Sequence, residues 1–419
     1  MAYVEFNPAY RDFLASQGLT EAGQLTALPG VVVCGHPERH VMQVTLPFPD
    51  SCWADESMRC FLKREHRVSW RQRLANAWAG FGFVSSSRRE ARLLKTLPEA
   101  GVGCADWLAA GEDNQGRAFL LVRALNDTVT LPVFLRERRG AGQRWRRQFC
   151  KHLGENLARL HDAGYEHRDL YAKHVLIDPS DASLYFLDWQ RGRQRAFLDW
   201  PRRWHDLAAL HATLADDVAG PRDRLACLRA YLRAVLAIRT PRRFHRQCVR
   251  QVRRQAERLL RRRPVREQRQ TSSAIGEQQL IWLDGEGLCV TPEFHAALSD
   301  RDRFLQLIRE DMPVAGLSRQ PLDVPGLGQT TLIRRWSRTS WRWLWSWLGG
   351  RRWLSPEVRQ AGLLFRLQRY GIGAPQLLAF GQRQKLPWRG ESFLLTAPLR
   401  ETIGLADWLE THSHPWTAE

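Results

Sequence analysis

The sequence predicts an α+β protein in which a two-lobed domain is followed by a truncated, degenerate copy of the first lobe. Short apolar runs typical of strands dominate up to about residue 125, and helical periodicity dominates from there to about residue 265. A later stretch repeats the first lobe in a nearly constant register. We therefore expect one domain over 1–265, with lobes at about 20–125 and 126–265, a linker over 266–290 and the repeat over 291–419.

The first lobe is expected to consist mainly of strands. The runs 31–34, 41–46 and 58–63 are apolar or alternating, and Gly, Pro and Asp residues separate them. Ser85, Ser86 and Ser87 are possible caps of a helix that continues to Leu97. The run 119–122 then has the composition of a buried strand.

The second lobe is expected to be mainly helical. A helix over 144–160 is predicted by apolar residues at spacings of three and four, namely Phe149, Leu153, Leu157 and Leu160. Two short strands, 175–177 and 184–187, follow a loop, and helices continue to about residue 263. The charge run over 261–273 contains helix breakers, so we place the domain boundary there.

The second part of the chain repeats the first. Residues 61–70 align with 332–341 at an offset of 271 positions, and residues 91–97 align with 361–367 at an offset of 270. Residues 101–111 align with 371–381 at the same offset of 270. Because the register is held this long, we interpret the pattern as a duplication of one domain type.

The composition is that of a soluble globular protein, with 44% hydrophobic and 26% charged residues. No run approaches the roughly 18 apolar residues of a membrane span, and the N-terminal residues lack the pattern of a secretory signal. The eight cysteines show neither a Cys-x-x-Cys pair nor a zinc-like spacing, which predicts reduced thiols in a cytoplasmic protein without zinc.

The positive charge comes almost entirely from arginine. The chain has 63 basic and 44 acidic residues, a formal charge of +19, and only five of the basic residues are lysines. Arginine binds phosphate and carboxylate groups through two parallel hydrogen bonds, so a polyanionic partner is one explanation of this excess, and genomic composition is another. Nucleic acid, anionic membrane and phosphorylated glycolipid all fit the charge alone.

One constellation has the chemistry of phosphoryl transfer. His167-Arg168-Asp169 lies between a predicted helix and a predicted strand, and Asp188 follows the next strand. This is the arrangement of the protein-kinase-like fold, in which one carboxylate accepts a proton from the attacking hydroxyl and another holds Mg²⁺. Upstream, Lys63 ends an apolar strand and Glu90 lies in the following helix, which is the kinase order.

The sequence resembles the lipopolysaccharide inner-core sugar kinases, the heptose/Kdo kinase family of Gram-negative bacteria. The resemblance covers about 20–260, with an echo of the first lobe over about 300–410, and its motifs are 61–63, 89–91, 161–174, 187–191 and 205–208. It implies a protein-kinase-like fold, ATP as the phosphate donor, and a core sugar hydroxyl as the acceptor at the cytoplasmic face of the inner membrane.

The resemblance also implies roles for individual residues. Asp169 would be the base on a catalytic loop that includes His167 and Arg168, Lys63 would bind the nucleotide phosphates, and Glu90 would pair with Lys63. Asp188 would hold Mg²⁺, and Asp206 would hydrogen-bond the catalytic-loop backbone. Together, these residues form the candidate site that the resemblance implies.

Two positions depart from the protein-kinase pattern. His174 stands where protein kinases have a metal-binding Asn; Mg²⁺ prefers oxygen ligands, so His174 is expected to orient the loop or to contact a phosphate. The glycine-rich loop is reduced to Gly35, and Arg39 or His40 could take its place at the phosphates. In the repeat, Lys63 aligns with Arg334 and Glu90 with Gln360, so the repeat is not expected to transfer phosphate.

The segment 336–353 combines six tryptophans with arginines, and three interpretations remain open for it. It could be a Trp-rich helix buried against the first domain, a membrane-surface element or a surface that stacks single-stranded nucleic acid. We expect as partners a lipopolysaccharide core glycolipid and an anionic membrane surface. No specific nucleic acid is expected, because no base-reading motif accompanies the charge.

The function predicted from these observations is ATP- and Mg²⁺-dependent phosphorylation of a sugar hydroxyl of the lipopolysaccharide core. The protein is expected to be cytoplasmic and peripheral on the inner membrane. Two alternatives stay open: a small-molecule kinase of the aminoglycoside or choline type, and a non-catalytic pseudokinase scaffold for core assembly.

Overall fold

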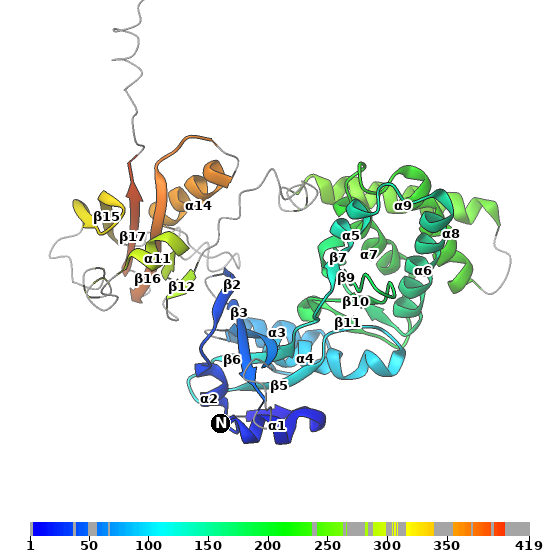
Figure 1. Ribbon diagram of the computed structural model, residues 1–419, viewed down its shortest axis with the longest axis horizontal. Helices are drawn as coiled ribbons and strands as arrows, with labels where there is room; N and C mark the ends of the chain where they lie inside the picture. Colours follow the sequence, from blue (N-terminus) through cyan, green and yellow to red (C-terminus); the bar gives the residue numbers. More distant parts are fainter. Residues whose placement is uncertain are drawn as a thin grey trace, which may run out of the picture. The chain divides into compact units, whose positions relative to one another are not determined.

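The structure is a computed structural model with two compact units, Met1–Thr271 and Ser272–Glu419, shown in Figure 1. It describes residues 3–36, 39–48, 57–65, 68–236, 241–262, 265, 281–283, 288–298, 304, 306, 308, 316–338, 355–369, 372–386 and 389–398. Among these residues, no helix combines the length and the apolar character that crossing a bilayer would take.

The first unit begins with a six-stranded antiparallel sheet in the order β1-β5-β6-β4-β3-β2. Its strands are β1 (Tyr3–Phe6), β2 (Val31–His36), β3 (Arg39–Pro47), β4 (Ser57–Glu65), β5 (Trp107–Glu112) and β6 (Ala118–Arg123). The alternating burial along β3 and β4 shows that one face of each strand is directed into the core. β5 and β6, which follow one another in the middle of the sheet, are buried along almost their whole length.

Helix α4 (Ser86–Thr96) packs against this sheet, mainly on β5 and β6. Ser85 caps the helix, because its hydroxyl accepts a hydrogen bond from the Arg88 amide. Ala91, Leu93 and Leu94 form its buried side. The remaining helices of this part are α1 (Arg11–Ser16), α2 (Ala22–Ala27) and α3 (Trp70–Trp78).

The rest of the first unit is mainly helical. Its helices are α5 (Leu131–Glu137), α6 (Gln143–Asp162), α7 (Trp200–Thr213), α8 (Pro221–Val235) and α9 (Arg242–Leu260). Three short strands, β10 (Leu184–Phe186), β9 (Val175–Ile177) and β7 (Val129–Thr130), form a small sheet, and β11 (Arg193–Gln194) pairs with β8 (Tyr165–Glu166). These short strands support the loops that carry the candidate site.

The predicted helix over 144–160 is present as α6, and its apolar residues face the core. Phe149, Leu153, Leu157 and Leu160 are all buried, as their spacing predicts. The core joins α4 and β6 to helices α6, α7 and α9. The sheet itself begins before residue 20, because β1 pairs with β5 along its whole length.

The second unit contains another six-stranded antiparallel sheet, in the order β12-β13-β16-β17-β15-β14. Its strands are β12 (Ile281–Leu283), β13 (Leu288–Val290), β14 (Gly316–Val324), β15 (Gly328–Arg338), β16 (Gln376–Leu386) and β17 (Arg389–Ala397). Helix α14 (Pro356–Arg369) packs on β16 and β17, and α11 (Pro292–Ala297) contacts β16.

The structure differs from the expected linker over 266–290. β12 and β13 lie inside that range and pair into the second sheet, with β13 next to β16. Their apolar runs are only three residues long, and the charged stretch before them hides their strand character in the sequence. The Trp-rich segment is described only as far as Arg338, so most of it lies outside the described residues.

Candidate active site

A buried ion pair joins the first sheet to α4. Lys63 near the end of β4 approaches Glu90 in the second turn of α4, with 2.5 Å between the Lys63 Nζ and the Glu90 Oε1. The Glu90 side chain is 1% exposed. A buried carboxylate is costly without partners, and the Arg39 Nη2 lies 3.0 Å from the second Glu90 oxygen. Glu90 therefore holds the Lys63 ammonium and the Arg39 guanidinium at the same end of the neighbouring strands β4 and β3.

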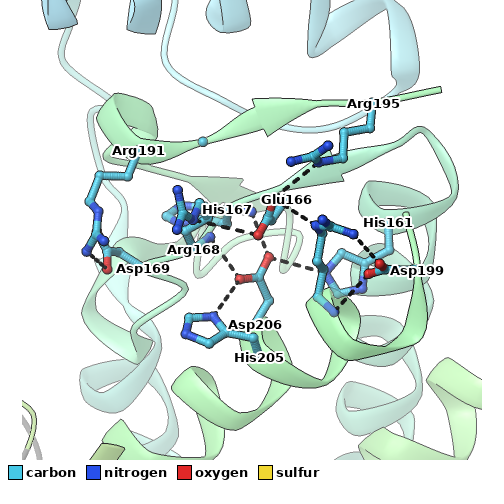
Figure 2. Close-up of polar contacts among 12 residues, drawn as sticks. His161, Glu166, His167, Arg168, Asp169, Arg191, Arg195, Asp199, His205 and Asp206 are labelled. Carbon is cyan, nitrogen blue, oxygen red and sulfur yellow. Dashed lines mark hydrogen bonds and ion pairs between the residues drawn. The ribbon is translucent and has the colours of Figure 1, made fainter. Parts of the chain in front are cut away.

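The catalytic loop runs from β8 through His167, Arg168 and Asp169 to β9. Asp206 in α7 anchors it from below, because its two carboxylate oxygens accept hydrogen bonds from the His167 amide at 2.6 Å and the Arg168 amide at 2.8 Å (Figure 2). The Asp206 side chain is fully buried, and His161 lies 3.5 Å from one of its oxygens. The role that the family resemblance implies for Asp206 fits this geometry.

Asp169 is held by an arginine. The Arg191 Nη1 donates to both carboxylate oxygens of Asp169, at 2.9 and 3.2 Å, and Figure 2 shows the two side chains facing each other. Asp169 is 12% exposed and Arg191 is 55% exposed, so the pair lies at the mouth of the site. Asp169 thus presents a partly accessible carboxylate beside the long, cationic side chain of Arg191.

His174 links Asp169 to Asp188. Its Nδ1 lies 2.9 Å from the Asp169 carbonyl oxygen, and its Nε2 lies 3.8 Å from the Asp188 Oδ2. The ring also stacks on that of His167, whose Nε2 contacts the Leu187 carbonyl oxygen at 2.8 Å. Because a carbonyl oxygen only accepts, both contacts assign the proton to the contacting ring nitrogen. These contacts place His174 between the loop backbone and the Asp188 carboxylate.

The electrostatics favour an ionised Asp188. Burial alone would raise the pKa of the Asp188 carboxyl, but the positive charges of Lys63, His174 and Arg39 outweigh burial and hold that pKa below its usual value. Burial lowers the pKa of His174 to about 4, which makes this ring neutral near pH 7. At neutral pH, Lys63 and Arg39 are therefore the cations that stabilise the Asp188 carboxylate.

Two site residues have left-handed backbone conformations. Arg168 has a φ of 69° and Asp188 a φ of 65°, a region that side chains other than glycine seldom adopt and that concentrates at functional sites. The turn after Asp188 is held by Arg89 of α4, whose guanidinium donates to the carbonyl oxygens of Arg191 and Gly192 at 2.8 and 2.7 Å. This arrangement places Asp188 and Arg191 on opposite sides of one tight turn.

The structure brings together all seven predicted site residues within the first unit: Lys63, Glu90, His167, Arg168, Asp169, His174 and Asp188. Two further residues were given no place in the predicted site. Arg191 contacts Asp169, and Gln190 contacts both Arg39 and the Asp188 carboxylate. Their signal in the sequence is their position directly after Asp188, within the motif 187–191 that carries the family resemblance.

The donor set suits a magnesium ion that is bound together with a nucleotide. The described residues contain no cluster of three His, Cys, Asp or Glu side chains that could hold a metal by themselves. Mg²⁺ in phosphoryl-transfer sites uses one or two carboxylates and takes its other ligands from phosphate oxygens and water. The ionised Asp188 carboxylate, with Lys63 nearby for the phosphates, fits that requirement.

Comparisons with known proteins place the chain in a family. Residues 60–231 match the model of the lipopolysaccharide kinase (Kdo/WaaP) family, and this range includes Lys63, Glu90, Asp169 and Asp188. The chain is 30% identical over 190 residues to the lipopolysaccharide core heptose(I) kinase WaaP of Pseudomonas aeruginosa. That match covers 42% of this chain and 70% of the relative.

A solved structure, WaaP in complex with acyl carrier protein, is similar with a TM-score of 0.44 and 24% sequence identity; the match covers 61% of this chain and 99% of that one. The family resemblance drawn from the sequence motifs is confirmed by the family model and by the curated relative. With 70% of a 30% identical relative aligned and the site inside the matched residues, the chain belongs to the lipopolysaccharide kinase (Kdo/WaaP) family.

Proposed function

We propose that the first unit transfers a phosphoryl group from ATP to a sugar hydroxyl of the lipopolysaccharide core. Membership of the family makes the protein a kinase, and the named relative acts on this glycolipid. The observation that carries the proposal is the convergence of Lys63, Asp169 and Asp188. Lys63 lowers the pKa of Asp188, and His174 lies between Asp188 and the Asp169 backbone.

Each residue then has a definite task. Asp169 accepts the proton of the attacking hydroxyl as its oxygen forms a bond to the γ-phosphorus; the bond to the β,γ-bridging oxygen breaks and ADP leaves with that electron pair. Lys63 binds phosphate oxygens, and Glu90 keeps its ammonium in position. Asp188 would hold Mg²⁺, which neutralises phosphate charge when bound. Most of the acceleration should come from positioning and charge stabilisation.

The test uses the purified full-length chain with ATP, Mg²⁺ and lipopolysaccharide whose core phosphates have been removed chemically. We expect mass spectrometry of the released core to show an added phosphate ester on a sugar. Kanamycin and choline serve as competing acceptors. Transfer to either of these instead of the core would favour a small-molecule kinase, and ATP binding without any transfer would favour a pseudokinase.

We also propose that the first unit is a two-lobed kinase-like domain and that the second unit is a degenerate copy of its first lobe. The neighbouring strands β5-β6-β4-β3 have the same order as β16-β17-β15-β14. The helix caps support the correspondence: the Ser85 amide donates to Glu112, and the Ser355 amide, 270 positions later, donates to Gln382. Calorimetry should give one ATP per chain, and a stoichiometry of two would contradict this proposal.

The second copy lacks the lysine and the glutamate that pair in the first site. Arg334 replaces Lys63, and Gln360, which replaces Glu90, is exposed. The buried carboxylate of that region is Glu357 instead, which accepts hydrogen bonds from the Arg335 Nε and the Ser392 hydroxyl, each at 2.6 Å. These partners satisfy Glu357 inside its own unit, which supports a structural role for it.

We propose further that the protein is peripheral on the cytoplasmic face of the inner membrane. Helix α9 supports this proposal, since it buries Cys248, Val252, Ala256 and Leu259 and exposes seven arginines, at positions 242, 243, 246, 250, 253, 254 and 258. Arginine-rich helix faces attract anionic lipid. The chain should float with vesicles containing phosphatidylglycerol and stay behind with pure phosphatidylcholine; equal behaviour with both would contradict the proposal.

A further inference from the structure

A cavity of about 400 Å³ opens beside Asp169. It lies between the catalytic loop, the turn after Asp188, the start of α7 and the residues after α9. Among its lining side chains are Arg168, Asp169, Tyr171, Arg191, Arg202 and Arg262. A ligand in this cavity therefore has access to the carboxylate that would accept the proton of the acceptor.

Arginine charge exceeds acidic charge around this cavity. Glu166, 7% exposed, is one of the carboxylates that line it, and Figure 2 shows the guanidinium groups of Arg195 and Arg168 beside it, at 3.5 and 3.7 Å. The Arg202 Nε lies 3.8 Å from Glu166, and the Arg202 Nη1 pairs with Asp199. The three distances to Glu166 exceed that of a tight ion pair, for which nitrogen and oxygen lie at about 2.7–2.9 Å. Three arginines thus share two carboxylates, which leaves guanidinium donors for another anion.

The arginines nearby are close enough to repel one another. The pKa of Arg89 falls to about 10, through burial first and then through the charges of Arg193, Arg168 and Arg191. Burial and the charge of Arg168 likewise lower the pKa of Arg193. An incoming anion would relieve this repulsion, which makes its binding more favourable than at an isolated arginine.

The segment after Asp188 contains no residue that could be phosphorylated to pair with these arginines. In many kinases, a phosphorylated residue after the metal-binding Asp pairs with such a cluster. Here, residues 189–204 contain no Ser, Thr or Tyr. A phosphorylated residue of this segment is therefore not the anion that these arginines bind.

Arg191 lines the cavity and also contacts Asp169, the proposed base. Its Nη1 contacts both Asp169 oxygens, while an acceptor hydroxyl needs one of those oxygens free. The Arg191 side chain is more than half exposed, so it can turn toward an anion in the cavity. An acceptor that carries such an anion would draw Arg191 away from Asp169 as it places its hydroxyl there.

We propose that this cavity binds a negatively charged group, a carboxylate or a phosphate, that the acceptor sugar or its neighbour carries close to the hydroxyl to be phosphorylated. The inference rests on the proposed function and specifies its substrate: an anionic core glycan, and not a neutral sugar. Arg202 and Arg262 act as specificity-determining residues for the acceptor, without a role in binding ATP.

The test compares Arg202→Gln and Arg262→Gln with Arg222→Gln, which removes an exposed arginine of α8 outside the lining of this cavity. Each full-length protein is assayed with three acceptors: dephosphorylated core oligosaccharide, the same material with its carboxyl groups reduced to alcohols, and core that retains its phosphates. The KM for the acceptor, the KM for ATP and kcat are measured separately, and calorimetry gives acceptor binding without ATP.

We expect each cavity variant to raise the KM for the anionic acceptor by about tenfold or more, the size of a lost charge-assisted hydrogen bond. The KM for ATP and the Arg222→Gln kinetics should stay at the parent values. If the KM difference between the cavity variants and the parent disappears on the carboxyl-reduced acceptor, the bound group is a carboxylate. If this KM difference exists only on core that retains its phosphates, the bound group is a phosphate.

Two results would overturn the inference while leaving the proposed function in place. One is an unchanged acceptor KM and affinity in both cavity variants while the parent phosphorylates the core. The other is an equal loss with neutral and anionic acceptors, because the arginines would then not recognise charge. Absence of core phosphorylation by the parent itself would instead refute the proposed function, and the inference with it.

Discussion

Replacing Asp206 with Ala should both destabilise the first unit and disable the catalytic loop. The substitution leaves the amides of His167 and Arg168 buried without their acceptors at 2.6 and 2.8 Å. Each unsatisfied buried donor costs about 1–3 kcal/mol, so the free energy of unfolding should fall by about 2–6 kcal/mol. A displaced loop also moves Asp169, and a shift of about 1 Å can lower kcat by about a hundredfold.

The assay combines urea denaturation with hydrogen exchange of a peptide spanning 165–175. Asp206→Asn keeps one acceptor oxygen, so we expect a smaller loss of stability than with Ala. Asp217→Ala is the matched control: it removes an exposed aspartate that pairs with Arg139, and exposed pairs contribute about 0–1 kcal/mol. If Asp206→Ala matches this control in stability, exchange and turnover, the anchoring role is wrong.

Further expectations concern the nucleotide site and acid stability. Lys63→Arg should raise the KM for ATP, because a forked guanidinium cannot replace the ammonium beside the buried Glu90; an unchanged KM would count against the phosphate-binding role. Asp188→Ala should abolish turnover at every Mg²⁺ concentration and leave the urea midpoint near that of the parent, whereas rescue by excess Mg²⁺ would show another metal ligand. Burial would raise the pKa of Asp206, but hydrogen bonds from His161 and His205 lower it below its usual value. Its ionised form therefore stabilises the fold above about pH 4, the pKa of an unfolded Asp. That stability is lost as the pH falls further, and Asp206→Asn should flatten this acid limb of a stability–pH profile.

The candidate site residues could be named from the sequence because their signals are local. Lys63 lies near the end of a strand and Glu90 follows a serine-capped helix start. Asp169 precedes the short apolar strand β9, and Asp188 follows β10. The helix α6 was also predictable, since its apolar spacing matches the face that it buries. Strand order and pairing partners are long-range properties, and the repeat is the sequence feature that predicts a second sheet like the first.

Other features depend on contacts that no local pattern contains. The pairing of Arg191 with Asp169 involves the turn that begins at the left-handed Asp188, and the contact of Arg39 with Glu90 requires that the Arg39 side chain reach α4 from the start of β3. The strands β12 and β13 fall in the range predicted as a linker, which follows a charged run with helix breakers; each is only three residues long, β12 pairs with β13, and β13 pairs with β16.

The most direct test of the phosphoryl-transfer account is single-turnover phosphate transfer by Asp169→Asn, with ATP binding measured in parallel by calorimetry. The substitution keeps the side-chain volume and removes the proton acceptor. The account predicts unchanged affinity for ATP and a transfer rate at least about a hundredfold lower, the smaller end of the contribution of a general base. A transfer rate within a fewfold of the parent rate would contradict it.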